Sequence, residues 1–451
     1  MVIDHHIADS VSKYACVINN QLCDYPNKSL CGTAMVYKFC CFLDQILNED
    51  KANNFLDLTA LALIADMMDL REFETHRLVE IGLKQLYNPF FKALANKQSF
   101  KLKDNMNPFG IGWYIAPLIN AVTRVGDYNE KLTVFESMLH FKAYEQILST
   151  KRGAKKGQTE PRVEQAVRLC GNIKNRQERI KEENTEIIIE LIKEQNLLDN
   201  KILAIRLDKD HAINRGLTGL IANQIANRFQ KPTLLLNYVE EEDGIHWMGS
   251  GRNFNFSPID DLRETLLNTH LPEFVEGHPN AFGFSILDKN FDLFMNTINN
   301  NLANIDFDTF YPVDIIYHGT DIKNEDIFKL AELKDIWGQE IKEPYIALEN
   351  IALTPEKIDL LGKDRKTIKF NLPNNLSIIT FEGSEEEYFQ LLEDCKDKRF
   401  TFIGTCSINS FMGNIQPQIK LEAYESNFVF WLRREQMCLS SPKIKITFRN
   451  F

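Results

Sequence analysis

The sequence predicts an α/β protein that ends in a small β-barrel, and three observations support this prediction. Amphipathic helical segments alternate with short apolar runs in the first and middle parts of the chain, which is typical of a parallel sheet covered by helices. A long stretch rich in Glu, Lys, Arg, Ile and Leu separates these two parts. Short strands with intervening turns follow near the C-terminus, at the spacing of a small barrel.

Length and composition are those of a multidomain globular protein. The 451 residues are 44% hydrophobic and 25% charged, and a chain of this length predicts roughly two to four domains. No apolar run approaches the roughly 18 residues that a membrane helix needs, and the start of the chain lacks a signal-peptide pattern. We therefore expect a cytoplasmic protein with no membrane contact. The nine cysteines include no Cys-x-x-Cys pair, which argues against a zinc knuckle or a disulfide framework.

Net charge weakens, without excluding, a nucleic-acid-binding function. The chain has 52 Lys and Arg residues against 63 Asp and Glu residues, so the formal net charge is -11. A protein that coats polyanions would be basic. A local basic groove can nevertheless coexist with an acidic exterior.

The first domain is expected over residues 1–157. Its first residues have the pattern of a buried strand that begins in its middle and opens into a polar loop. The almost wholly apolar run over 56–66 is placed in the same sheet. A basic stretch over 151–157 ends the domain as a loop or boundary. Helical periodicity predicts helices over 32–46, 75–87 and 134–149.

One long connecting helix is expected over 158–198, because this stretch is dense in helix-forming residues and has few breakers. A second α/β domain follows over 199–300, in which strands over 201–207 and 233–236 flank a helix over 217–229. The remaining assignments are a connecting segment over 301–345, the barrel over 346–426 and a C-terminal tail over 427–451. The barrel strands are expected over 367–372, 376–381, 399–407 and 418–424.

Candidate metal ligands lie where the first strand opens into a loop. Asp4, His5 and His6 are consecutive, and side chains that alternate along a strand can converge where the strand breaks. Carboxylate and imidazole ligands together are more typical of manganese, magnesium-like or iron sites than of a zinc site, which uses thiolates. In isolation, however, such a tripeptide is more often an ordinary surface loop.

A second carboxylate, Asp66, ends the apolar run over 56–66. Charged side chains are rarely buried without partners, so Asp66 either caps a helix N-terminus or binds a cation. If the run is a strand of the sheet that contains Asp4, both carboxylates meet at the carboxyl edge, where open α/β sheets place ligands. This convergence favours a shared metal site.

Further motifs extend along nearly the whole chain. In order, they are Val2–His6, Leu30–Lys38, Ala62–Asp66, Ile115–Asp127, Asn214–Leu220, Gly249–Arg252, Gly277–Gly283, Phe402–Gly413 and Pro417–Gln418. This order resembles the RecJ family of single-strand-specific exonucleases, which belongs to the DHH phosphoesterase superfamily. The resemblance implies a parallel-sheet DHH domain, a connecting helix, a second α/β domain that binds substrate and a C-terminal OB-fold barrel.

The resemblance also implies a function and a set of site residues. The function is 5'-to-3' degradation of single-stranded DNA in recombination and repair, by phosphodiester hydrolysis at a site for two Mn²⁺ or Mg²⁺ ions. Arginine can grip a phosphate bidentately, and a histidine in a turn can bind or protonate a phosphate oxygen. The implied metal and catalytic residues are Asp4, His5, His6 and Asp66. The implied phosphate contacts are Asn120, Arg124, Ser250, Arg252 and His278, and the implied DNA contacts of the OB-fold are Asn409 and Gln418.

The sequence departs from the family pattern in two respects. RecJ proteins have two further aspartate motifs before the Asp-His-His strand, and this chain starts too late to contain them; Asp306 and Asp308 are better explained as an ordinary acidic loop. Three explanations stay open: a truncated reading frame, a split gene whose other product completes the domain, and a degenerate regulatory protein. The second departure is Leu118, where the family commonly has arginine.

Three functional hypotheses follow. The first is a RecJ-type nuclease whose activity alone stays open, with an upstream fragment as one candidate partner that would complete the DHH domain and single-strand-binding or helicase proteins as others. The second is a non-catalytic protein that binds single-stranded DNA or acts as a scaffold. The third is a phosphodiesterase acting on short oligonucleotides or cyclic dinucleotides. The predicted barrel argues against the third hypothesis, because short substrates need no additional binding platform.

Overall fold

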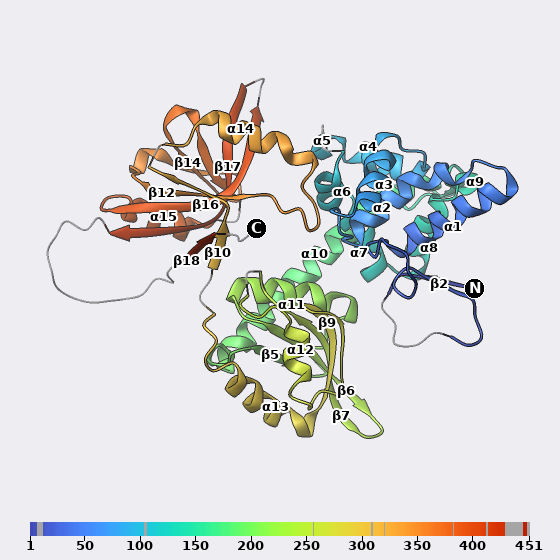
Figure 1. Ribbon diagram of the computed structural model, residues 1–451, viewed down its shortest axis with the longest axis horizontal. Coiled ribbons are helices and arrows are strands. Elements are labelled where there is room, and N and C mark those ends of the chain that lie inside the picture. Colours follow the sequence, from blue (N-terminus) through green and yellow to red (C-terminus); the bar gives the residue numbers. More distant parts are fainter. Residues whose placement is uncertain are drawn as a thin grey trace. The chain divides into compact units, whose positions relative to one another are not determined.

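The computed structural model describes residues 1–6, 12–102, 106–255, 257–307, 310–319, 321–381, 383–411, 414–428 and 445–448. Figure 1 shows the helices and strands of the chain, which divides into two compact units. Unit 1 consists of Met1–Ile180 together with Leu333–Glu343, and unit 2 consists of Lys181–Glu332 and Pro344–Phe451. No helix among the described residues is both long and apolar enough to cross a membrane.

Unit 1 is mostly helical. Its helices are α1 (Gly32–Leu47), α2 (Leu56–Ala65), α3 (Phe73–Lys84), α4 (Pro89–Lys97), α5 (Ser99–Leu102), α6 (Pro108–Tyr114), α7 (Ala116–Val125), α8 (Tyr128–Ser137), α9 (His140–Ala143) and the first half of α10 (Arg162–Glu194). Asn88, Asn107 and Asp127 each cap a helix by accepting hydrogen bonds from backbone N–H groups of its first turn. These caps fix where α4, α6 and α8 begin.

The strands of unit 1 are short. β1 (Val2–Asp4) pairs in parallel with β2 (Val17–Asn19), and β3 (Gln146–Leu148) pairs antiparallel with β4 (Thr159–Pro161). The basic stretch over 151–157 is the loop of this second pair, and unit 1 continues beyond it to Ile180. The helix expected over 134–149 is instead divided among α8, α9 and β3.

The prediction of a strand over 56–66 is wrong, because these residues form α2. Seven of the ten α2 residues are buried, and α2 contacts α1, α3, α6 and α7. A helix that is covered on all sides is apolar on all sides, so its sequence lacks the polar face that would reveal the helical period. Its Leu63 lies in the unit 1 core with Phe90, Phe91, Leu94, Ile111 and Ile115.

The long helix predicted between the domains is confirmed as α10, and the boundary between the two units falls within it, after Ile180. The first sheet of unit 2 has five strands in the order β5-β6-β7-β9-β8, of which only β5 and β6 pair in parallel. These strands are β5 (Leu203–Leu207), β6 (Thr233–Glu241), β7 (Gly244–Arg252), β8 (Phe274–His278) and β9 (Ala281–Leu287). Its helices are α11 (Arg215–Phe229), α12 (Leu262–Leu267) and α13 (Asp288–Asn301).

The second sheet of unit 2 has seven strands in the order β11-β12-β16-β17-β15-β14-β13. They are β11 (Ile315–His318), β12 (Tyr345–Ile351), β13 (Ile358–Leu361), β14 (Thr367–Asn371), β15 (Ser377–Thr380), β16 (Lys398–Phe411) and β17 (Asn414–Phe428). Phe370, Phe400 and Phe402 lie in its core, together with residues of α14 (Asn324–Glu332) and α15 (Glu385–Asp394).

Part of the segment expected to connect the domains over 301–345 belongs to this sheet. β11 pairs with β12, and Ile327 of α14 is fully buried in the same core. Upstream of β11, β10 (Phe310–Val313) pairs in parallel with β18 (Lys445–Phe448), a strand in the tail predicted over 427–451. The rest of that tail after Phe428, and Asp308 of the acidic loop, lie outside the described residues.

Candidate metal centre and nucleic-acid contacts

The end of β1 brings three candidate ligands together. His6 Nδ1 lies 2.7 Å from Asp4 Oδ1, and His5 Nδ1 lies 3.8 Å from the same oxygen. The two imidazole rings are 4.2 Å apart between centroids. The hydrogen bond with His6 holds the pKa of Asp4 below its usual value, so this carboxyl group is ionised at neutral pH. One donor atom from each residue fits within 4.8 Å of the others, which is compact enough for one ion.

Asp66 joins this cluster from the end of α2. Its Oδ2 lies 3.1 Å from Nε2 of His5. The predicted convergence of these residues is therefore present, although Asp66 comes from the C-terminus of a helix and neither from a strand edge nor from an N-cap. The sequence could not show this, because α2 has no polar face.

The turn after Asp66 is a Schellman motif. Met67 has a positive φ of 57°, its N–H donates to the carbonyl of Ile64, and the N–H of Met68 donates to the carbonyl of Leu63. Glycine is the usual residue at the position of Met67, because a Cβ is unfavourable in the left-handed region. The chain therefore tolerates local strain directly beside Asp66.

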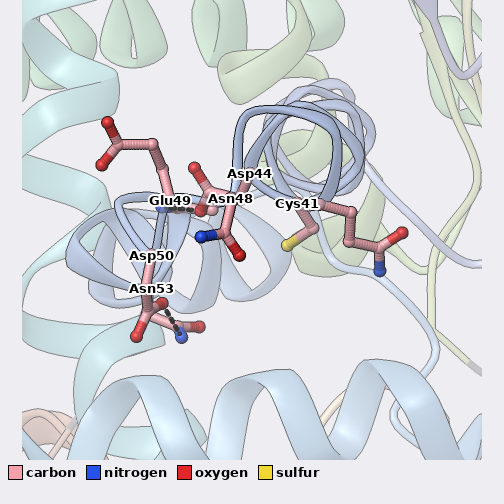
Figure 2. A pocket seen from close by; sticks show the side chains of 8 residues that line it. Cys41, Asp44, Asn48, Glu49, Asp50 and Asn53 are labelled. Carbon is pink, nitrogen blue, oxygen red and sulfur yellow. Dashed lines mark hydrogen bonds between the residues drawn. The ribbon is translucent and has the colours of Figure 1, made fainter.

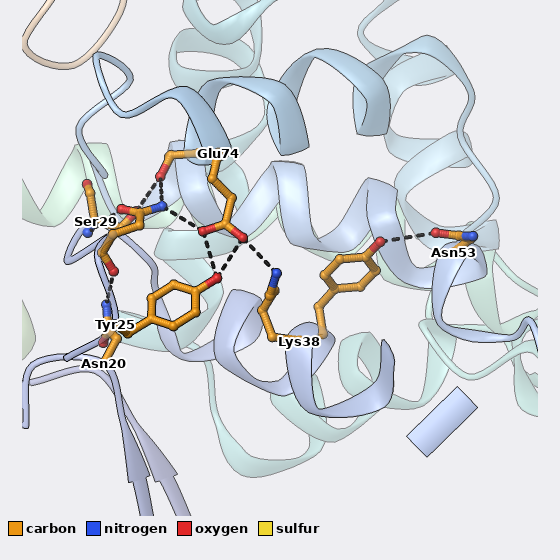
Figure 3. A network of polar contacts seen from close by, with 9 residues as sticks. Asn20, Tyr25, Ser29, Lys38, Asn53 and Glu74 are labelled. Atoms are coloured by element: carbon orange, nitrogen blue, oxygen red, sulfur yellow. Dashed lines mark hydrogen bonds and ion pairs between the residues drawn. The ribbon is translucent and has the colours of Figure 1, made fainter. Parts of the chain in front are cut away.

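A polar network links the loop before α1 to Glu74 of α3 and Lys38 of α1 (Figure 3), and Ser29 of this loop also contacts the turn. Ser29 Oγ accepts a hydrogen bond of 2.5 Å from the N–H of Asp69, and the Ser29 carbonyl accepts one from Thr75 Oγ1 at the start of α3. Glu74 accepts hydrogen bonds from Tyr25, Asn27 and Lys38. Burial alone would raise the pKa of Glu74, but these donors, Lys38 first, outweigh it and leave the pKa below its usual value.

One nitrogen of His5 makes the cluster suitable for a cation. His5 Nδ1 is buried, and no hydrogen-bond partner for it exists within the described part of the chain. Buried polar atoms are normally bonded, so an unpaired imidazole nitrogen beside carboxylates indicates a missing ligand. Mn²⁺ binds both carboxylate oxygens and imidazole nitrogens, whereas Mg²⁺ prefers the carboxylate oxygens. Asp4, His5, His6 and Asp66 could therefore hold a divalent cation.

The thiol of Cys31 lies near the cluster and is shielded from solvent. This thiol lies just before α1 and is 2% exposed. Burial raises its pKa to about 11, and the negative charge of Asp66 contributes in the same direction. Cys31 is therefore protonated at neutral pH and is no thiolate ligand.

Asn120 and Arg124, the predicted phosphate contacts of unit 1, lie one turn apart on α7, so their side chains share one side of the helix. Asn120 is half-buried and Arg124 is exposed, and α7 packs against α2. Leu118, which replaces an arginine of the family pattern, packs against the apolar core instead. The functions of Asn120 and Arg124 stay predictions.

Ser250 and Arg252 lie on one face of β7, against the first turns of α11. Ser250 Oγ is 2.9 Å from Thr218 Oγ1, and Arg252 Nη1 donates to the carbonyl of Gly251. The Arg252 guanidinium lies directly against α11 at Gly219, because a Cβ at this glycine would collide with Arg252 Nη2. These contacts hold the guanidinium and a hydroxyl near the helix N-terminus, an arrangement suited to an anion.

His278 reaches the same face of the sheet. Ala281 of β9 is directly opposite both Arg252 of β7 and His278 of β8, and opposed residues in antiparallel strands point to the same side. The exposed His278 therefore lies two strands from Arg252 at the same end of the sheet. This register supports a common phosphate-binding surface for the two residues within unit 2.

The two residues predicted to contact DNA in the barrel differ in accessibility. Asn409 is half-buried on β16, opposite Gln416. Gln418 is 8% exposed, and its amide donates to Ser377 Oγ. Its side chain therefore connects β17 to β15, and the structure does not support it as a surface contact. Only Asn409 remains a candidate.

A second histidine cluster was missed by the sequence analysis. Glu241, Asp243 and His246 of the β6–β7 hairpin also have donor atoms within 4.8 Å of one another. The buried His246 contacts Asp243 Oδ1 at 2.7 Å and Glu273 Oε2 at 2.6 Å, so both ring nitrogens are bonded. The side chains alternate along β7 with no local motif, and Glu273 is distant in sequence, so only the strand pairing brings these groups together.

An acidic cavity of about 280 Å³ lies at the C-terminal end of α1 (Figure 2). Asp44 Oδ2 accepts hydrogen bonds from the N–H groups of Lys51 and Ala52, and Asp50 Oδ1 accepts one from Asn53. These bonds stabilise the turn after α1. The acidic lining is thus accounted for by local structure.

Comparison with known proteins gives a consistent result along the chain. The model of the RecJ OB domain matches residues 313–423, which begins earlier than the barrel expected over 346–426 and includes β11 and α14. The chain is 36% identical over 438 residues to a putative SPbeta prophage-derived single-strand DNA-specific exonuclease, YorK, of Bacillus subtilis (strain 168), covering 96% of this chain and 75% of YorK. It is 25% identical over 413 residues to the single-stranded-DNA-specific exonuclease RecJ of Bacillus subtilis, covering 89% of this chain and 47% of that protein.

Two solved structures share the fold. RecJ from Thermus thermophilus in complex with Mn²⁺ superposes with a TM-score of 0.65 at 16% identity, covering 94% of this chain and 58% of that one. Its Mg²⁺ complex gives a TM-score of 0.64 at 17% identity, covering 92% and 59%. The chain thus spans less than two thirds of either structure. The mixed α/β fold with a C-terminal barrel-type sheet is confirmed.

Proposed function

The chain belongs to the RecJ family of single-strand DNA-specific exonucleases, and on this premise we propose that it hydrolyses single-stranded DNA with Mn²⁺ or Mg²⁺ held by Asp4, His5, His6 and Asp66. The observation that carries the proposal is the position of His5. Its Nε2 contacts Asp66 at 3.1 Å while its buried Nδ1 faces Asp4 without a hydrogen bond. A bound divalent cation would polarise a phosphate oxygen and lower the pKa of water at that place.

The side chains of this cluster have separable tasks. Asp4 and Asp66 provide negative charge and oxygen donors, and His5 lies between them. His6 is largely exposed and hydrogen-bonded to Asp4, so it also orients that carboxylate. Within unit 2, Arg252, Ser250 and His278 would hold the phosphates of the strand, and the barrel around Asn409 would hold further nucleotides. The 5'-to-3' direction and a role in recombination and repair are proposed from the family.

The donor set is small for two cations. Two ions need bridging carboxylates that neutralise their charge, and Asp4 and Asp66 are the only carboxylates that the described part of the chain places on His5 and His6. We propose that another polypeptide segment supplies further carboxylates. The surface of unit 1 supports such an addition, because β1 and β2 pair in parallel with no further strand from the described residues, and parallel strands are normally covered. Phe42, Ile46 and Leu47 of α1 are also 54–65% exposed.

The test is a nuclease assay on single-stranded DNA labelled at either end. We expect mononucleotides to be released from the 5' end when Mn²⁺ is present, by the chain alone or with an added polypeptide covering the part of YorK that it lacks. Asp66→Asn and His5→Ala should reduce the rate more than about 100-fold, because both remove ligands. His211→Ala, an exposed histidine of unit 2, is the matched control and should retain activity.

Failure of both the chain and the completed mixture to cut DNA would exclude the nuclease proposal. The small donor set favours a second candidate, a non-catalytic protein that binds single-stranded DNA. That candidate predicts binding that weakens with salt and survives both Asp4→Ala and His5→Ala. Cleavage of dinucleotides but not of longer strands would instead indicate a short-oligonucleotide phosphodiesterase.

A further inference from the structure

A short segment from late in the sequence is part of unit 1. Leu333–Glu343 lies between α14 and β12 in the chain, yet it groups with Met1–Ile180. We call residues 333–343 the strap. Its tip is a tight turn, in which Gly338 and Ile341 exchange two backbone hydrogen bonds of 3.0 and 3.1 Å and Glu340 adopts a positive φ of 65°.

The strap contacts the turn that follows Asp66. The N–H of Leu70 donates to the carbonyl of Gln339 at 3.3 Å. Gly338 lies directly on the buried Leu70, because a Cβ at this glycine would collide with the Leu70 side chain. Ile341 packs against the apolar core of unit 1. Backbone pairing, close packing and contact with the apolar core therefore coincide within a few residues.

Arg71 adds an ionic contact between the two segments. It forms hydrogen bonds with both oxygens of Asp69, and its Nη2 lies 3.7 Å from Glu340 of the strap. The hydrogen bond from Arg71 holds the pKa of Asp69 below its usual value. Since Arg71 is exposed, this ionic contact contributes less than the packing at Leu70 and Ile341.

The turn after Asp66 is thus held from two sides. Ser29 binds the N–H of Asp69 on the side of α1, and the strap binds Leu70 and Arg71 on the other. The turn needs such support, because Met67 occupies a backbone region that is unfavourable for a residue with a side chain. Without the strap, the turn would lose the backbone bond to Gln339 and the contacts of Leu70 and Arg71 with residues 338–340.

We propose that the strap positions Asp66 beside His5, so that residues 333–343 control the metal affinity of a site to which they contribute no ligand. The effect on metal binding rests on the proposed function, whereas the effect on the turn does not. Gly338 and Ile341 are the positioning residues. A displacement of Leu70 would be transmitted to Asp66, because only three residues of a hydrogen-bonded turn separate them.

The experiment compares Ile341→Asp with Ile336→Asp. The first variant places a charge in the apolar contact and releases the strap. The second makes the same change at a strap residue that is 42% exposed, and serves as the matched control. Hydrogen–deuterium exchange of peptides covering residues 62–72 should accelerate in Ile341→Asp and stay as in the unmodified protein in Ile336→Asp. Peptides from α4 and α10 should be unchanged, which shows that unit 1 remains folded.

Metal affinity is measured on the same proteins by the electron paramagnetic resonance signal of free Mn²⁺. We expect Ile341→Asp to raise the Mn²⁺ dissociation constant about 10-fold, as losses of outer-shell support do. Ile341→Val should restore it. Gly338→Ala, a smaller change at Leu70, should give an intermediate value.

The outcomes separate this inference from the proposed function. Unchanged exchange over residues 62–72 in Ile341→Asp overturns the strap inference, whether or not Mn²⁺ binds. Faster exchange with an unaltered Mn²⁺ affinity overturns it as well, because the strap would then stabilise the turn without positioning Asp66. If the unmodified chain binds no Mn²⁺ at all, the proposed function fails, and the exchange data alone decide whether the strap holds the turn.

Discussion

Two histidine–carboxylate clusters of similar composition differ in how many bonds their central histidine already makes. His246 contacts Glu273 through Nδ1 and Asp243 through Nε2 at 2.6 and 2.7 Å. His5 contacts Asp66 at 3.1 Å, while its buried Nδ1 makes no hydrogen bond within the described structure. In both clusters, three side chains place one potential metal-binding atom each within 4.8 Å of the others. The difference shows that the unused bonding capacity of a buried ring, and not ligand composition, distinguishes a candidate site from a structural ion pair.

The largest expected effect contrasts the two histidines in metal binding. Asp66→Ala and His5→Ala should each weaken Mn²⁺ binding more than about 100-fold, because each removes a direct ligand. His246→Ala should leave the Mn²⁺ affinity unchanged, because its cluster is already neutralised by internal bonds. Isothermal titration with Mn²⁺ measures all three variants. Equal losses at His5 and His246 would show that the comparison is mistaken.

A smaller effect concerns stability as a function of pH. The hydrogen bonds to Asp243 and then Glu273 raise the pKa of His246 above its usual value of 6.5. The folded state thus binds this proton more tightly than the unfolded state, so the stabilisation is complete below about pH 6.5 and is lost as pH rises through the elevated pKa. The melting temperature should fall over this range.

His246→Gln should flatten this pH profile, because glutamine can occupy the site without titrating. A melting temperature that rises as pH increases above 6.5 would contradict the raised pKa of His246.

The smallest expected effect is a change in stability caused by the positive φ beside each cluster. The β6–β7 hairpin places Gly244 at a positive φ of 139°, whereas the turn beside Asp66 places Met67 at 57°. Met67→Gly should raise the free energy of unfolding by up to about 1 kcal/mol, because it relieves the left-handed strain. Chemical denaturation measures this change. A clear loss of stability would show instead that the Met67 side chain contributes packing that outweighs the strain.

Several elements were predictable because their pattern is local. The helical period over 32–46 correctly predicted α1. The uninterrupted run of helix-forming residues over 158–198 correctly predicted α10. The strands of the barrel were identified from apolar runs separated by turns, close to β14, β15, β16 and β17. The proximity of Asp66 to His5 was also predicted, but from a strand and not from a helix. Helix α2 is covered on all sides, so its sequence has no helical period of apolar and polar residues.

Other features depend on pairing between distant segments, and no local pattern reveals these. Glu273 reaches His246 only because β8 and β7 flank the same strand, β9. Gln418 was selected from the family resemblance, and its burial against Ser377 follows from the parallel pairing of β15 and β17. The strap likewise has no counterpart in the sequence motifs, because its contacts join residues more than 250 positions apart.

This last separation has a consequence for biosynthesis. The ribosome completes residue 180 well before residue 343, and at roughly 5–20 residues per second the interval is on the order of 10–30 s. During that interval the helices of the first 180 residues can already assemble, while the contacts of Leu70 with Gly338 and Gln339 do not yet exist. If the strap positions Asp66 as proposed, the nascent chain would reach its full metal affinity only after residue 343 has been synthesised, when strands β12 to β17 of the second sheet have still to follow.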